Sequence, residues 1–159
     1  MSRRLVAIRH AQALYSQEIE DELLPLSVEG SEIQRQSSEF LLKRGIKPHF
    51  IQSSPLLRAQ QTAEILGEVF SIKPIINESL GYNFNTQTLL QEISSLKDQE
   101  TLFMVGHEPT LAQFVNALVG KAVLPYGLEK SGSVVIDFLE GVDFEKASFV
   151  HYYQAHFNT

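Results

Sequence analysis

The chain has 159 residues, of which 43% are hydrophobic, and a formal net charge of −6. This length suffices for one domain with a full core and is too short for two ordinary ones, so we expect residues 1–159 to form a single domain. The negative charge argues against broad binding to nucleic acid or to anionic membranes, because both require a basic face. The chain has no cysteine, which excludes disulfides, thiolate metal sites and cysteine nucleophiles.

The N-terminus carries only a short apolar segment. Ser2, Arg3 and Arg4 precede an apolar run that stops at Arg9 after four residues, whereas a signal peptide needs about 7 to 15 apolar residues. No window of the sequence approaches the roughly 20 apolar residues of a membrane span. We therefore expect a cytoplasmic protein that does not associate with membranes.

The first predicted elements are a strand and a helix. The strand covers Leu5 to Arg9 in the stretch LVAIRHAQA, and it ends on the basic pair Arg9 and His10 instead of on turn residues. The helix begins after Ser27, an N-cap in the segment PLSVEG, and ends at Gly45, a glycine that follows a cationic last turn. One face of this helix is expected to carry Ile33, Ser37, Phe40, Leu41 and Arg44.

The next elements repeat the alternation of strand and helix. HFIQSSP predicts a strand and a turn, and Ser54 and Pro55 are expected as N-cap and first residue of a helix. The apolar residues of that helix recur every three or four positions, namely Leu56, Ala59, Ala63, Leu66 and Phe70. A short strand is expected over 72–76, followed by the polar loop NESLGYNFN and by a helix with the apolar residues Leu89, Leu90, Ile93 and Leu96.

The last third of the chain completes the pattern. TLFMVG predicts a strand, and a helix begins at Pro109 and buries Leu111, Phe114, Val115, Leu118 and Val119. SVVIDFL and ASFVHYYQA predict an antiparallel pair at the end of the sheet. Strands that alternate with amphipathic helices indicate the α/β class, here a three-layer α/β/α sandwich with a mostly parallel central sheet.

Basic and imidazole side chains follow three of these strands. Arg9 and His10 end the first, Arg58 lies in the first turn or so of the helix after the second, and His107 ends the strand TLFMVG. In open α/β sheets, ligands bind beyond the carboxyl ends of the strands, beside helix N-termini that favour anions. Arginine binds phosphoryl oxygens with two donors at once, and a neutral imidazole can attack phosphorus. The pattern therefore predicts a phosphate pocket.

Three separated motifs in this order resemble the histidine phosphatase superfamily, which has the phosphoglycerate mutase-like fold. The motifs are the Arg9-His10 pair, SSPLLRAQQTAEIL around Arg58, and VGHEP around His107. The short length, the PLSVEG segment and the lack of large insertions look most like the small SixA branch, whose members remove phosphate from protein phosphohistidine. The resemblance implies that His10 forms a phosphohistidine intermediate, while Arg9, Arg58 and His107 bind the phosphoryl oxygens.

Two positions differ from the superfamily pattern or are less well defined by it. The first motif usually reads Arg-His-Gly, and Ala11 in the third place implies that the backbone there does not need a positive φ. Many members of the superfamily place a proton-donating carboxylate in the region of Glu78, whereas the SixA-like branch generally does without one. Glu78 is therefore a possible general acid.

Three readings of the function are considered, and the short chain favours the first, because few residues remain to build a lid around a small metabolite. The first is a protein phosphohistidine, such as that of a histidine-containing phosphotransfer domain in signal transduction. The others are a small phosphate ester such as a sugar phosphate, and phosphate binding without catalysis. We expect no cofactor and no metal, because the chain lacks a cysteine cluster, an HExxH motif or a carboxylate cage. Gln12 and Ser131 could contact the substrate, and the remaining histidines are expected to be structural or solvated, namely His49, His151 and His156.

Overall fold

The computed structural model describes residues 2–155. Its six strands are β1 (Arg3–Arg9), β2 (Phe50–Ser53), β3 (Ile75–Ile76), β4 (Thr101–Gly106), β5 (Ser133–Phe138) and β6 (Ala147–Tyr153). The α-helices are α1 (Val28–Lys43), α2 (Leu57–Phe70), α3 (Thr86–Ser94) and α4 (Thr110–Val119). Two short 3-10 helices, η1 (Asp21–Leu23) and η2 (Glu78–Leu80), lie in the connections after β1 and β3.

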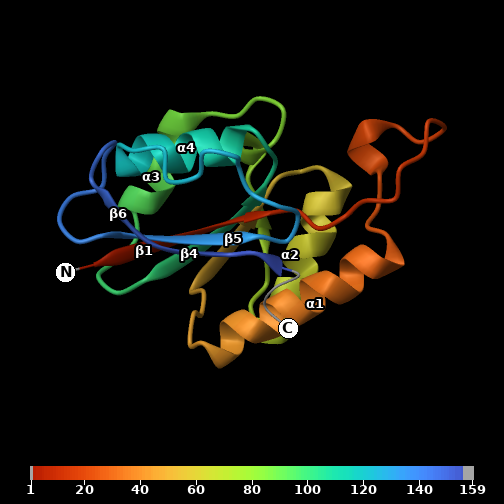
Figure 1. Ribbon diagram of the computed structural model, residues 1–159, viewed down its shortest axis with the longest axis horizontal. Coiled ribbons are helices and arrows are strands. Elements are labelled where there is room, and N and C mark those ends of the chain that lie inside the picture. Colours follow the sequence, from red (N-terminus) through yellow and green to blue (C-terminus); the bar gives the residue numbers. More distant parts are fainter. Residues whose placement is uncertain (1, 156–159) are drawn as a thin grey trace.

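The strands form one sheet in the order β3-β2-β4-β1-β5-β6. β3, β2, β4 and β1 run parallel, β5 is antiparallel to β1, and β6 is antiparallel to β5. α3 and α4 cover one face of the sheet, and α1 and α2 cover the other (Figure 1). This is the predicted three-layer sandwich with a mostly parallel sheet.

Burial on both faces explains why residues Leu5 to Ile8 of β1 form an unbroken apolar run. Leu5 and Ala7 pack with α3 and α4, whereas Val6 and Ile8 pack with α1 and α2. Each of these side chains is at most 1% exposed. This part of a central strand has no solvated face, so all four positions are apolar between Arg4 and the rim at Arg9.

The local signals at the ends of α1 are confirmed. Ser27 is the N-cap, with its hydroxyl accepting a hydrogen bond from the Gly30 amide at 2.9 Å, and Gly45 has the positive φ of a C-terminal glycine. Gly30 has a second role, because a Cβ there would collide with the carbonyl oxygen of Gln12. The start of α1 can therefore pack closely against the chain just after His10.

Several predicted details are wrong. β1 begins two residues earlier than predicted, and the strand expected over 72–76 is reduced to Ile75–Ile76, an exposed pair at the sheet edge. On α1, Ile33 and Phe40 are only partly buried and Arg44 is exposed, while the buried positions are Gly30, Gln34, Ser37, Ser38 and Leu41. The buried Gln34 side-chain amide donates to the Ser38 hydroxyl at 3.0 Å, and this hydroxyl donates to the Gln34 backbone carbonyl at 2.7 Å, while Gln34 Oε1 has no partner among the described residues.

The start of α2 also differs from the prediction. The helix begins at Leu57 with Leu56 as N-cap, so Ser54 and Pro55 lie before it. The Ser54 hydroxyl accepts a hydrogen bond from the Leu56 amide and lies within hydrogen-bond distance of a ring nitrogen of His107. The Ser54 side chain, which the local pattern assigned to the helix cap, therefore contacts His107 after the end of β4.

Candidate active site

Arg9 and His10 are held at the end of β1 by backbone hydrogen bonds from both sides. The His10 amide donates to the Gly106 carbonyl at the end of β4, at 3.0 Å, and the Arg9 amide donates to Gly132 at 3.2 Å. The Ser131 amide donates in turn to the carbonyl of Arg9 at 3.0 Å. The motif is therefore fixed between the ends of two neighbouring strands, and Ser131 touches it through its backbone.

Ala11 fits this backbone without strain. It is fully buried, and it is not among the described non-glycine residues with positive φ. Its amide donates to the Thr62 hydroxyl on α2 at 3.0 Å. The alanine in place of the usual glycine thus leaves the loop in an ordinary conformation, as predicted.

His10 is buried, with 8% of its surface exposed, and its tautomer follows from one contact. Nδ1 lies 2.6 Å from the carbonyl oxygen of Ala11. Because a carbonyl can only accept, Nδ1 carries the proton and Nε2 of the neutral ring keeps its lone pair. Burial lowers the pKa of His10 to about 3. The hydrogen bond to the Ala11 carbonyl raises this pKa, and the charges of His107, Arg58 and Arg9 lower it by smaller amounts.

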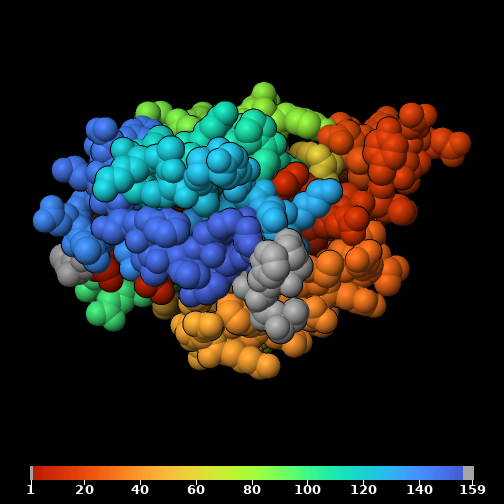
Figure 2. Space-filling view, viewed as in Figure 1, coloured from red at the N-terminus to blue at the C-terminus, as the bar shows by residue number. Residues whose placement is uncertain are grey.

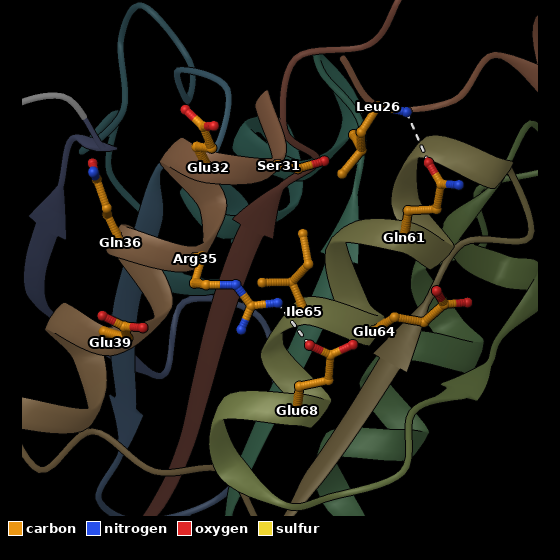
Figure 3. Close-up of a pocket in the computed structure, with 10 residues that line it drawn as sticks. All are labelled: Leu26, Ser31, Glu32, Arg35, Gln36, Glu39, Gln61, Glu64, Ile65 and Glu68. Carbon is orange, nitrogen blue, oxygen red and sulfur yellow. Dashed lines mark hydrogen bonds and ion pairs between the residues drawn. The ribbon is translucent and has the colours of Figure 1, made fainter. Parts of the chain in front are cut away.

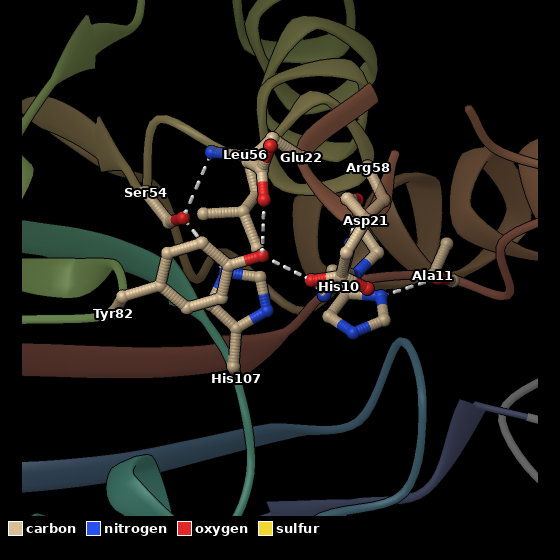
Figure 4. A network of polar contacts seen from close by, with 9 residues as sticks. All are labelled: His10, Ala11, Asp21, Glu22, Ser54, Leu56, Arg58, Tyr82 and His107. Carbon is tan, nitrogen blue, oxygen red and sulfur yellow. Dashed lines mark hydrogen bonds and ion pairs between the residues drawn. The ribbon is translucent and has the colours of Figure 1, made fainter. Parts of the chain in front are cut away.

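His107 follows β4 and faces His10. The two ring centroids are 5.1 Å apart, and Nε2 of His107 lies 2.7 Å from the Ser54 hydroxyl (Figure 4). Burial lowers the pKa of His107 to about 4, and the charge of Arg58 lowers it further while that of Asp21 raises it. When Ser54 donates to Nε2, the proton of His107 lies on Nδ1, which is buried and has no partner among the described residues. That N–H can then donate to a phosphoryl oxygen.

The two guanidinium groups complete the cluster. Arg58 is the second residue of α2, and its side chain is 13% exposed. Arg9 donates through Nη1 to the Leu128 carbonyl at 3.0 Å, and its buried Nε has no partner within the described part of the chain. Both arginines lower the pKa values of both histidines, so all four groups act on one another. Arg9, His10, Arg58 and His107 are called the histidine–arginine cluster below.

Sequence reasoning missed three residues beside this cluster, namely Ser54, Asp21 and Tyr82. The Asp21 carbonyl accepts from Arg58 Nη1 at 2.7 Å, and its carboxylate is 3.3 Å from Nη2. The Tyr82 hydroxyl donates to the Asp21 carboxylate and also lies 3.0 Å from Glu22 (Figure 4). The hydrogen bond from Tyr82, followed by the charge of Arg58, lowers the pKa of Asp21. Asp21 is one of several acidic residues in its segment, and Tyr82 lies in a polar loop, so the sequence does not indicate these contacts.

The remaining predicted residues lie outside the cluster. Glu78 is the exposed first residue of η2, and no hydrogen bond or ion pair joins its side chain to another described residue. His49 Nδ1 accepts from the Thr101 amide at 3.0 Å, and the ring of His151 packs on Tyr153, as expected for structural residues. His156 lies outside the described residues. Within 2–155, no group of three or more His, Cys, Asp or Glu residues could hold a metal ion.

A groove of about 630 Å³ lies between α1 and α2 (Figure 3). It is acidic, because its lining includes four glutamates and one arginine, and the Arg35 guanidinium pairs with Glu68 at 2.6 Å. Its lining residues are Leu26, Ser31, Glu32, Arg35, Gln36, Glu39, Gln61, Glu64, Ile65 and Glu68. None of the predicted site residues lines this groove, which therefore has a different chemistry from the cluster.

The family model of the histidine phosphatase superfamily (branch 1) matches residues 5–81, which carry Arg9, His10 and Arg58. No curated protein sequence matches the chain. None of the helices in the described part of the chain is both long and apolar enough to cross a membrane.

Solved structures share the fold over nearly the whole chain. The protein histidine phosphatase SixA complexed with tungstate has a TM-score of 0.85 at 17% identity, with 98% of this chain and 99% of that chain covered. A candidate phosphohistidine phosphatase SixA from Agrobacterium tumefaciens has a TM-score of 0.80 at 24% identity, covering 94% and 96%. The mycobacterial glucosyl-3-phosphoglycerate phosphatase has a TM-score of 0.71 at 21% identity, covering 96% and 98%.

Proposed function

We propose that this chain is a metal-independent phosphatase of the histidine phosphatase superfamily with His10 as nucleophile, because residues 5–81 match the model of that superfamily and the fold is shared with SixA. The observation that carries the proposal is the hydrogen bond from His10 Nδ1 to the Ala11 carbonyl. It leaves the Nε2 lone pair free, and the low pKa of about 3 keeps the ring neutral at physiological pH. A neutral, oriented imidazole is the form that attacks phosphorus.

The reaction has two displacements at phosphorus. In the first, Nε2 of His10 forms a bond to phosphorus while the bond from phosphorus to the leaving group breaks, and the leaving group keeps the electron pair. In the second, water attacks the phosphohistidine, phosphate leaves, and His10 returns to its neutral form. The water loses one proton, and the leaving group takes up one proton, so the overall reaction is hydrolysis.

Arg9, Arg58 and His107 stabilise the charge that spreads over the equatorial oxygens in the transition state. Both arginines have donors that the described residues do not use, and so does His107 when Ser54 donates to its Nε2. These groups are held in place before substrate arrives, by β1, β4 and the first turn of α2. A preorganised set of cations and N–H donors can supply the charge stabilisation that a metal ion supplies in other phosphoryl transfer enzymes.

For the substrate, we favour a protein phosphohistidine, such as that of a histidine-containing phosphotransfer domain. An imidazole leaving group can take its proton from solution, so it does not need a positioned general acid. Glu78, the one acid that the sequence suggested for that role, is exposed and has no contact that would aim it at the cluster. The structural likeness to SixA proteins supports the same substrate.

A small phosphate ester is the second candidate. The observation that favours it is the shared fold with a mycobacterial glucosyl-3-phosphoglycerate phosphatase. Release of an alkoxide requires a proton donor, and a positioned acid contributes about 100- to 10,000-fold to the rate. In this case Glu78 would have to reach the leaving oxygen when substrate is bound.

The two candidates are separated by one set of measurements after treatment with EDTA. Wild type and Glu78→Gln are assayed on a phosphohistidine phosphotransfer protein, a sugar phosphate and an aryl phosphate. For a phosphohistidine phosphatase, the substitution has little effect on the protein substrate, and the wild type is poor on the sugar phosphate. Brisk sugar phosphate hydrolysis that depends on Glu78 contradicts our preferred substrate. Phosphate binding without turnover of any substrate indicates a binding module, and recovery of activity only with added metal contradicts the metal-independent mechanism.

A further inference from the structure

Residues 12–26, here called the arm, connect the end of β1 to the start of α1. The arm leaves the rim of the sheet, extends away from it and returns (Figure 1). Its base is closed by a backbone bridge between Ala13 and Leu26 and by a hydrogen bond from Leu26 to Gln61 on α2 at 2.8 Å. Its 3-10 helix η1 brings Asp21 back beside the histidine–arginine cluster.

Three segments that are distant in the sequence meet at Asp21. Arg58 donates to the Asp21 carbonyl at 2.7 Å and lies 3.3 Å from its carboxylate, and Tyr82, after η2, donates to the same carboxylate (Figure 4). Asp21 is half exposed, with 52% of its side chain accessible, whereas Arg58 is 13% exposed. The contact therefore matters more to the enclosed guanidinium than to the acid.

The donor geometry leaves Arg58 able to bind phosphate while Asp21 holds it. A guanidinium has five N–H donors in a rigid plane. Asp21 takes one from Nη1 and one from Nη2, so the Nε–H and the second donors of Nη1 and Nη2 are not used by it. An arginine fixed by one pair of donors presents the others in a set direction, which reduces the entropy lost when an oxyanion binds.

We propose that Asp21 is a positioning residue that holds the Arg58 guanidinium toward the substrate phosphoryl group, and that the Tyr82 hydroxyl fixes the Asp21 carboxylate. The proposal rests on the proposed function in that Arg58 binds the phosphoryl group. The ionised carboxylate of Asp21 also offsets part of the positive charge of the two arginines in the cluster. Hydrogen bonds from Tyr82 and Arg58 keep the pKa of this carboxyl low, so the charge persists at neutral pH.

The alternative is that Asp21 competes with the substrate for Arg58. A carboxylate beside an anion site repels phosphate through space, and removing it would then strengthen phosphate binding. The two roles predict opposite signs for the same measurement. The dissociation constant of inorganic phosphate therefore distinguishes them, even if the physiological substrate is something other than phosphohistidine.

The test is a double-mutant cycle between Asp21 and Arg58. Asp21→Asn, Arg58→Ala and the double variant are compared with wild type by the Kd of inorganic phosphate and by kcat/KM on an aryl phosphate. We expect Asp21→Asn to weaken phosphate binding and to lower kcat/KM by about 10-fold, the lower end for residues that orient a binding ligand. In the Arg58→Ala background the same change should have almost no effect, because it acts through the missing guanidinium.

Tyr82→Phe and Glu20→Gln complete the design. Tyr82→Phe removes only the hydroxyl and should weaken phosphate binding in the same direction by a smaller factor. Glu20→Gln removes one negative charge from the arm at a residue whose side chain does not cap η1, so it reports the general effect of charge. We expect it to leave the Kd and the melting temperature unchanged, and the other variants must melt like the wild type for the comparison to hold.

Three outcomes would overturn the proposal. Tighter phosphate binding by Asp21→Asn would show competition, and equal losses with and without Arg58 would show that Asp21 acts independently of it. If Glu20→Gln weakened phosphate binding as much as Asp21→Asn does, Asp21 would act only through its negative charge. Failure of the proposed phosphatase activity has a different signature, because wild type and all variants would then show no turnover. The Kd values of inorganic phosphate in the double-mutant cycle would still report on the role of Asp21.

Discussion

The histidine–arginine cluster and the groove between α1 and α2 are both lined by charged or titratable side chains, but the two differ in sign, burial and pairing. In the cluster, two arginines and two histidines converge at the rim of the sheet, and both histidines have strongly lowered pKa values. The groove is lined by four glutamates and one arginine, and the Arg35–Glu68 pair is exposed, at 47% and 63% of the side chains. The groove is roomy, yet an exposed ion pair of this kind does not indicate chemistry. Groups with shifted pKa values and unused hydrogen-bond donors indicate a functional site better than the volume of a cavity does.

The largest expected effect is the loss of the nucleophile from the cluster. His10→Ala should abolish turnover while the protein stays folded, because the other residues of the site are held by backbone contacts and by α2. The wild type should carry acid-labile, alkali-stable phosphate during turnover, which can be measured by trapping with labelled substrate. A variant that keeps a tenth of the wild-type rate would contradict the covalent role of His10.

The second effect concerns the geometry of the cationic charge. Arg58→Lys keeps the charge but loses the planar set of donors that contacts Asp21 on one side and phosphate on the other. We expect kcat/KM to fall by about 10- to 1000-fold, the upper end being the loss of one oxyanion donor. Steady-state kinetics on an aryl phosphate measures this, and unchanged kinetics would mean that Arg58 does not contact the substrate.

The third prediction concerns the titration of the histidines in the cluster. With a pKa of about 3, His10 should remain neutral and protonated on Nδ1 down to about pH 4, whereas a histidine with the ordinary pKa is about 90% protonated at pH 5.5. Ring nitrogen chemical shifts measured by NMR against pH report both the pKa and the tautomer. A midpoint near pH 6.5 for His10 would contradict the burial argument.

The same titration affects stability, and the sign follows from the direction of the pKa change. The unfolded chain protonates His10 near its ordinary pKa of 6.5, whereas the folded protein protonates it near 3. The free energy of unfolding is therefore unaffected by His10 above pH 6.5 and falls as the pH drops toward 3. Urea unfolding of His10→Ala should show a weaker decline over this interval, and equal pH dependence in both proteins would contradict the assignment.

The smallest effect is expected in the groove. Arg35→Ala breaks the exposed pair with Glu68, and exposed ion pairs contribute about 0 to 1 kcal/mol to stability. We therefore expect a minor change in the urea midpoint and an unchanged kcat/KM. A large loss of activity would assign the groove a part in catalysis and would remove the contrast between the two regions.

The features that the sequence predicts well are those with local causes. The end of β1 at Arg9, the Ser27 cap and the positive φ of Gly45 depend on residues within one helical turn. The positions of Arg9, His10, Arg58 and His107 follow from the general rule that parallel strands end at one rim. This rule does not predict the order of the strands, because β1 lies between β4 and β5, and both are far from β1 in the sequence.

The features that the sequence does not predict depend on long-range contacts. Ser54 was assigned to a helix cap, but His107, 53 positions away, lies against its hydroxyl. Asp21 and Tyr82 are 61 positions apart and lie in segments without hydrophobic periodicity. Their contact depends on where the arm returns relative to η2, and no local propensity determines that path.

The central place of β1 in the sheet has a consequence for biosynthesis. β1, which leads into His10, is synthesised well before its partners in the sheet, which are β4, from Thr101, and β5, from Ser133. Contacts so far apart in sequence form slowly, because a long loop must close before they contribute free energy. A nascent chain that ends before β5 already contains every residue of the histidine–arginine cluster but lacks the strand that pairs with β1 on the side opposite β4. Phosphate affinity should therefore arise only after β5 has been synthesised and has paired with β1.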